Sequence, residues 1–215
     1  MDQPAQQFRI TQSRFALDLT FKIKLNRQEF GDVMRKLRVF ESISVDGFFT
    51  DANDDMSWAH AGRDDPEFAT WVGTNASSGS ELLFGRKTYQ EMEAYWPTPI
   101  AAQQMPEVAK GMNAAKKYVV SKTIQPEWNN THLLQDDFVN TVRDLKKTVG
   151  PNITVLGSGS VAAQLGEAGL VDEYQFVIVP VALGAGRSVF TKRYGLRLVD
   201  QRSFRCGNVA VIYAV

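Results

Sequence analysis

Short apolar runs alternate with amphipathic stretches along the chain from residue 37 onward. Continuous or period-two apolar runs predict strands at residues 37–45, 81–84, 116–121, 153–156, 173–181, 196–204 and 208–215. Helical spacing predicts helices at residues 65–72, 85–96 and 136–147, and one that follows the strand at 153–156 and runs through Leu165. Strands that alternate with helices indicate an α/β fold with crossover connections. The last two strands flank Cys206-Gly207-Asn208, which predicts an antiparallel hairpin at one edge of the sheet.

Residues 1–33 differ from the rest of the chain and form a predicted N-terminal extension to a domain at 34–215. Apolar residues recur at strict period two between Phe15 and Leu25, which is typical of a half-buried strand. Two interpretations stay open for this extension. It adds a strand at a sheet edge or a dimer contact, or it is a loosely held tail.

Charge and composition exclude several classes of function. Lysine and arginine balance aspartate and glutamate at 24 each, which argues against a nucleic-acid partner. No apolar run reaches membrane-spanning length, and the first residues lack a signal-peptide pattern, so we expect a cytoplasmic protein without membrane contact. The single cysteine cannot form an internal disulfide. With only two histidines beside it, we expect no His/Cys metal site.

A glycine turn follows the predicted strand at 153–156. Its sequence, Gly157-Ser158-Gly159-Ser160-Val161-Ala162, matches the dinucleotide fingerprint G-x-G-x-x-G/A. A Rossmann domain is excluded, because only 53 residues follow Ala162 and the acidic residue expected after the next strand is missing. The glycines can still expose the first amides of the following helix to a phosphate group, or they can simply form a tight turn.

Two other strand ends carry cationic and hydroxyl side chains. Gly85, Arg86, Lys87 and Thr88 lie where one predicted strand passes into a helix, and Ser121-Lys122-Thr123 follow another strand. Arginine can contact two phosphate oxygens at once, and open α/β sheets bind their ligands at the carboxyl ends of the strands. The three junctions together predict a ligand with several phosphates.

Six motifs occur in a recognisable order: SISVDGFF, NDDMSW, LLFGRKTY, VVSKT, VLGSGSVAAQL and GLVDEYQFVIVPVALGAGRSVF. From about Leu37 to Val215 the chain resembles the dihydrofolate-reductase-like superfamily. It is most similar to the branch with the C-terminal reductase domain of the bifunctional riboflavin-biosynthesis deaminase-reductase. The resemblance implies a mostly parallel central sheet of about eight strands, flanking helices and a C-terminal antiparallel hairpin. It also implies NADPH as the cofactor and a homodimer.

The resemblance assigns cofactor contacts by position. Arg86, Lys87 and Thr88, after Gly85, would hold the 2′-phosphate and the pyrophosphate, and Ser121 and Lys122 would approach the 2′-phosphate of the adenosine. Gly157, Ser158, Gly159, Ser160 and Val161 would lie along the pyrophosphate and the nicotinamide ribose. Ser42, Ile43 and Ser44 would line the nicotinamide, and the segment with Met56 and Trp58 resembles a mobile loop that closes over it.

The proton donor is the point at which the chain departs from dihydrofolate reductases. The candidate carboxylates are Glu67, which can equally be a helix N-terminal charge, and Asp46, which can equally be a turn residue. The zinc signature of the deaminase partner is absent. The sequence therefore predicts a stand-alone NADPH-dependent reductase of a small pterin- or ribosylaminopyrimidine-type substrate. The alternative is an NADPH-binding sensor or assembly protein without turnover.

Overall fold

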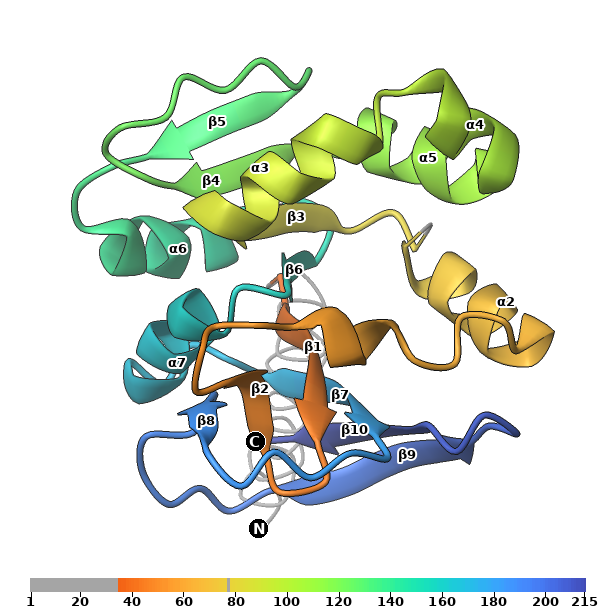
Figure 1. Cartoon of the computed structure of the whole chain (residues 1–215). Helices are drawn as coiled ribbons and strands as arrows, with labels where there is room; N and C mark the ends of the chain where they lie inside the picture. Colours follow the sequence, from red (N-terminus) through yellow and green to blue (C-terminus); the bar gives the residue numbers. More distant parts are fainter. Residues whose placement is uncertain (1–34, 77) are drawn as a thin grey trace, which may run out of the picture.

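Eight strands form one central sheet in the computed structural model, which describes residues 35–76 and 78–215 (Figure 1). In sheet order they are β5 (Thr131–Leu134), β4 (Lys117–Val120), β3 (Glu81–Gly85), β6 (Ile153–Leu156), β1 (Leu37–Ser44), β7 (Glu173–Val179), β10 (Val209–Ala214) and β9 (Arg197–Ser203). The six strands from β5 to β7 are parallel, whereas β10 is antiparallel to both β7 and β9. The predicted α/β class, the mostly parallel sheet and the C-terminal hairpin are confirmed. The predicted extension at 1–33 lies outside the described residues.

Helices cover both faces of this sheet, because the inner strands are apolar on both sides. On one face, α6 (Phe138–Lys146) and α7 (Gly159–Glu167) pack against Leu37 and Val39 of β1. The opposite face carries two clusters. One lies between β3, β4 and the helices α3 (Arg86–Tyr95) and α5 (Pro106–Ala114), and the other lies beneath α2 (Pro66–Ala76). No helix within the described residues is long and apolar enough to cross a bilayer.

Several short elements were not predicted from the sequence. Strands β2 (Phe48–Asp51) and β8 (Gly186–Ser188) form a separate two-stranded sheet, and a 3-10 helix, η1 (Ser57–His60), lies in the polar loop after β2. Helix α4 (Pro99–Gln104) precedes α5, and each starts at a proline, a residue suited to the first turn. The Thr98 hydroxyl also accepts the amide of Ala101 and caps α4. These elements span at most nine residues, which is too short for a clear hydrophobic period.

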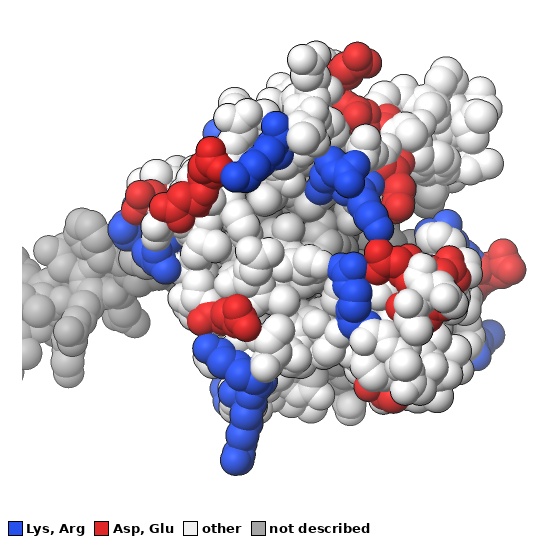
Figure 2. Space-filling model, turned by 60° about the vertical axis from the view of Figure 1, so that its left-hand side comes forward, with Lys and Arg blue, Asp and Glu red and all other residues white. Residues whose placement is uncertain are grey.

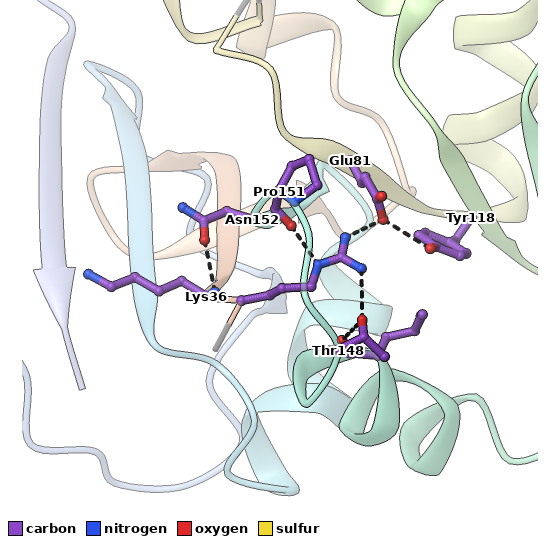
Figure 3. A network of polar contacts seen from close by, with 8 residues as sticks. Lys36, Glu81, Tyr118, Thr148, Pro151 and Asn152 are labelled. Carbon is purple, nitrogen blue, oxygen red and sulfur yellow. Dashed lines mark hydrogen bonds and ion pairs between the residues drawn. The ribbon is translucent and has the colours of Figure 1, made fainter. Parts of the chain in front are cut away.

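A polar network that includes Glu81, Tyr118 and Thr148 joins the amino ends of the strands (Figure 3), and Arg35 lies at its centre. Its guanidinium is buried, pairs with the Glu81 carboxylate at the start of β3, and donates from Nε to the Pro151 carbonyl at 2.5 Å. Glu81 also accepts the Tyr118 hydroxyl of β4 at 2.9 Å, and the Arg35 Nη1 reaches the Thr148 hydroxyl at 3.5 Å. Arg35 therefore joins the entry to β1 with β3, β4 and the segment before β6.

Candidate functional site

Two of the predicted phosphate-binding junctions meet at the carboxyl ends of β3 and β6. These strands are neighbours, so the end of β3 at Gly85 lies beside the turn that follows β6. The Gly85 amide donates to the Ser158 hydroxyl at 2.9 Å, and a Cβ at Gly85 would lie 3.3 Å from Val161. The structure therefore brings these two predicted junctions together.

The turn after β6 is tight, and its glycines pack closely against the side chains of Thr88 and Phe49. Gly157 and Ser158 both have left-handed backbones, with φ of +59° and +63°. A Cβ at Gly157 would lie 3.2 Å from the Thr88 methyl group, and one at Gly159 would lie 2.5 Å from the Phe49 ring. The first amides of a helix have no partner within it, so this turn forms a cradle suited to an anion.

Arg187 is a further cationic side chain at this site, beside the predicted Arg86 and Lys87, and the sequence analysis missed it. Arg187 lies on β8, donates to the Ser160 hydroxyl and has its guanidinium 5.1 Å from the centre of the Phe49 ring. The Asp54 carboxylate forms an ion pair with both Arg187 and Lys87, and in each pair the nitrogen and the oxygen are 2.7 Å apart. The hydrogen bond from Lys87 and the charge of Arg187 lower the pKa of Asp54. An arginine in the glycine-rich stretch after β7 was the available signal, because parallel strands end at a common edge.

The third junction lies at the end of β4, one strand further along the sheet. The Ser121 hydroxyl is buried and accepts the amides of Thr123 and Ile124 at 3.2 and 3.3 Å, so it fixes this turn. Lys122 is exposed and lies 2.5 Å from the Asp136 carboxylate, which raises the pKa of the lysine. Arg86 donates to Gln90 on its own helix at 3.3 Å. Lys122 and Arg86 are therefore surface cations at neighbouring strand ends.

These strand ends form one side of the molecule. The arrowheads of β4 and β5 point to the left in Figure 1, and this is the side that Figure 2 brings forward. Lysine and arginine side chains border a largely uncharged area there, with acidic side chains among them (Figure 2). The surface thus offers separate cationic positions around an uncharged centre, which suits a ligand that carries both phosphates and rings.

Asp46, one of the two predicted catalytic carboxylates, fixes the chain at the end of β1. Its carboxylate accepts the Ser44 hydroxyl at 2.6 Å and the amides of Leu183 and Gly184 at 2.7–3.1 Å. The Ser44 hydroxyl bond, followed by the Gly184 amide, lowers the pKa of Asp46 to about 2. Asp46 is therefore ionised at neutral pH, and its bonds favour a structural role over proton donation.

Ser42 lies on the same face of β1 as Ser44, while Ile43 packs into the cluster on the other face.

Glu67, the other predicted catalytic residue, lies near the far edge of the sheet. Its Oε1 is 2.6 Å from the Arg202 guanidinium of β9, a strand four places from β6 in the sheet order. Four strand spacings amount to about 19 Å, so Arg202 holds Glu67 well away from the glycine turn. The structure does not bring Glu67 together with the predicted cofactor contacts.

A buried carboxyl group, Glu41, lies in the middle of β1 and was also missed. Phe40 pairs with Leu156, the last residue of β6, and the Gly157 amide donates to the Phe40 carbonyl at 2.8 Å. Glu41 therefore lies next to the glycine turn. The residue is 2% exposed, and its Oε2 has no hydrogen-bond partner among the described residues. Burial raises the pKa of Glu41 to about 8. A charged residue at period two with the apolar positions Leu37, Val39 and Ile43 was the available signal.

Comparison with protein families places the chain among known proteins. The family model of the RibD C-terminal domain matches residues 35–212, which include every element of the described fold except the last two residues of β10. The chain belongs to the RibD C-terminal domain family. This assignment confirms the resemblance to the reductase branch of riboflavin biosynthesis. The glycine turn, the cationic strand ends and Glu41 are thus features of one member of the RibD C-terminal domain family.

Individual relatives agree with this family. The chain is 29% identical over 184 residues to the uncharacterised protein YyaP of Bacillus subtilis, covering 83% of this chain and 94% of YyaP. A putative riboflavin biosynthesis protein from Shewanella has the same fold, with a TM-score of 0.60, 18% identity and coverage of 83% and 98% of the two chains. A pyrimidine reductase-like protein from Corynebacterium diphtheriae gives a TM-score of 0.53, 14% identity and coverage of 84% and 92%. RibD of Acinetobacter baumannii gives a TM-score of 0.55 and 12% identity, and the match covers 58% of the RibD chain.

Proposed function

We propose that this protein is an NADPH-dependent reductase that transfers a hydride to a small pterin- or ribosylaminopyrimidine-type substrate. The observation that carries the proposal is the cradle formed where Gly85 and the Gly157–Ser158 turn meet, with Lys87 and Arg187 beside it. Membership of the RibD C-terminal domain family supports a reductase of this kind. The name of the C. diphtheriae protein, pyrimidine reductase-like, supports the substrate class.

The residues at this site fit the phosphates of a dinucleotide. Gly157 allows the left-handed backbone of the turn, and the start of α7 supplies amides that favour an anion. Arg86 and Lys122 are exposed cations that could contact an additional 2′-phosphate, which would favour NADPH over NADH. When bound, the nicotinamide would supply the hydride, while the protein orients the substrate and excludes water.

A second function rests on the state of the two predicted proton donors. Asp46 accepts several hydrogen bonds, and Glu67 is paired with Arg202 at a distant strand. Reduction of a C=N bond also needs a proton, so turnover would require a positioned water or another acid. A protein that binds NADPH as a sensor or an assembly module, without turnover, is therefore the alternative.

Titration calorimetry with NADPH and NADH, followed by absorbance assays at the nicotinamide band, tests both functions. The substrates are dihydrofolate and a ribosylaminopyrimidine. Oxidation of NADPH with either substrate would support the reductase, and binding without oxidation of either would favour the sensor. An absence of NADPH binding would refute both. The Arg86→Ala variant should weaken NADPH more than NADH, whereas Lys110→Ala, which removes an equal charge on α5, should change neither.

We also propose that the protein acts as a cytoplasmic homodimer. The outer strand β9 is exposed along its length, with Leu198 and Val199 48% and 52% exposed. An exposed edge strand with apolar side chains is suited to pairing with another chain. Light scattering of the full chain after gel filtration tests this, and a monomeric mass at micromolar concentration would contradict it.

A further inference from the structure

One carboxylate joins two cations at the edge of the candidate site. Lys87 lies in the first turn of α3, Arg187 lies on β8, and Asp54 lies in the segment between β2 and η1. Each oxygen of Asp54 lies 2.7 Å from one of these cations. Arg187 also donates to Ser160, in the first turn of α7. The four side chains therefore connect the starts of α3 and α7 with β8 and with the loop after β2.

The chemistry of this cluster matches that of a phosphate site. Guanidinium and ammonium groups bind carboxylates and phosphates with the same donors, and a helix start favours either anion. Asp54 thus makes contacts of the kind that a ligand phosphate would make. Since the lysine and arginine side chains are 70% and 49% exposed, water and a dissolved anion can reach them.

The loop that carries Asp54 is held mainly by its own bonds. The Asp51 carboxylate accepts the amides of Asn53 and Asp55 at 2.8 Å each, and the Asp51 amide donates to the Asp55 carbonyl at 3.1 Å. Asp54 adopts a left-handed backbone, with φ of +67°, at the tip of this turn. The two ion pairs of Asp54 are contacts of this loop with α3 and β8, so their loss would leave the loop freer to move.

We propose that Lys87, Arg187 and Ser160 form a subsite for a ligand phosphate, and that Asp54 occupies this subsite until a phosphate displaces it. Displacement breaks both ion pairs of Asp54 and frees residues 51–60 to move. The subsite rests on the proposed function and extends it. It assigns a position to one phosphate of the cofactor, and the binding of that phosphate would release the loop that carries Asp54. Asp54 then acts as a competitor of the ligand and lowers its apparent affinity.

Asp54→Asn tests this competition, with Asp64→Asn as the matched control. Both variants remove one negative charge from an exposed position in the same part of the chain. The probes are inorganic pyrophosphate and NADPH, measured by calorimetry. Hydrogen exchange of residues 51–60 gives a second readout that requires no catalysis. Two exposed ion pairs are lost in Asp54→Asn, so we expect about 10-fold tighter binding of pyrophosphate.

Hydrogen exchange should report the same competition between Asp54 and the phosphate. Pyrophosphate should speed exchange of residues 51–60 in the unmodified protein, and Asp54→Asn should exchange fast without it. Arg187→Gln should also exchange fast but bind pyrophosphate more weakly, whereas Asp64→Asn should match the unmodified protein. Unchanged or weaker pyrophosphate binding by Asp54→Asn would overturn the subsite. Pyrophosphate effects without any NADPH binding would leave the subsite standing and refute the proposed cofactor.

Discussion

The buried carboxyl group of Glu41 should make the stability of the protein fall as the pH rises above the ordinary range of a glutamate. Glu41→Gln replaces the carboxyl group with an amide of nearly the same size that carries no charge at any pH. The side chain is 2% exposed and lies opposite Phe176 in the apolar cluster beneath α7. Ionised Glu41 would therefore be a buried charge with an unpaired oxygen.

The magnitude follows from the two pKa values of this group. The pKa is 4.5 in the unfolded chain and about 8 in the folded protein, so between these values the folded state binds a proton that the unfolded state has released. Stability is highest below the lower value and decreases as the pH rises to the upper one. Each pH unit changes the free energy of unfolding by at most about 1.4 kcal/mol, which gives an upper value of about 5 kcal/mol.

Urea denaturation of both proteins between about pH 5 and about pH 8 measures this effect. The two should differ little near pH 5, and Glu41→Gln should become the more stable by several kcal/mol near pH 8. The difference between them cancels other titrating groups, such as Lys117, whose pKa burial lowers to about 8. Glu107→Gln, at an exposed position in α5, should behave like the unmodified protein. A pH-independent difference between the Glu41 variant and the unmodified protein would show that the reasoning is wrong.

Three further substitutions test other parts of the structure. Arg35→Ala leaves Glu81 without its buried partner and should lower the free energy of unfolding in urea by about 3–5 kcal/mol, while a loss below about 1 kcal/mol would contradict the network. Gly159→Ala places a methyl group against the Phe49 ring and should cost about 1–3 kcal/mol and weaken NADPH binding, measured by calorimetry. Asp46→Asn should lower the melting temperature but keep NADPH oxidation, whereas loss of oxidation in the folded variant would restore the catalytic role.

Most of the sheet could be predicted from the sequence, because buried parallel strands read as apolar runs between turn residues. The strands β1 and β7 and the hairpin of β9 and β10 are examples. Strand β5 was missed because it is four residues long at the edge of the sheet and buries only Leu134 fully. Strands β2 and β8 are as short and pair across more than 130 residues, which no local pattern reveals.

The candidate site was predictable where it depends on strand ends. Gly85 and Ser158 were expected at one edge of the sheet, since parallel strands end together, and they share a hydrogen bond. Arg187 and Asp54 were missed because they reach the site only through the pairing of distant segments. The roles of Asp46 and Glu67 depend on their hydrogen-bond partners, Gly184 and Arg202, more than 130 residues away in the chain. Neighbouring residues could not reveal either contact.

The strand ladder also has a practical consequence for attaching the protein to a surface. Arg38 of β1 pairs with Glu173 of β7, which pairs with Ala214 of β10. Residue 35 and the carboxyl end of the chain therefore both lie on the side of the sheet where the parallel strands begin. The glycine turn lies toward the opposite side, where the parallel strands end, and the eight residues of β1 span about 26 Å between the two sides. A tether ahead of residue 35 or after Val215 would therefore hold the molecule by one side, with the ligand side facing the solution.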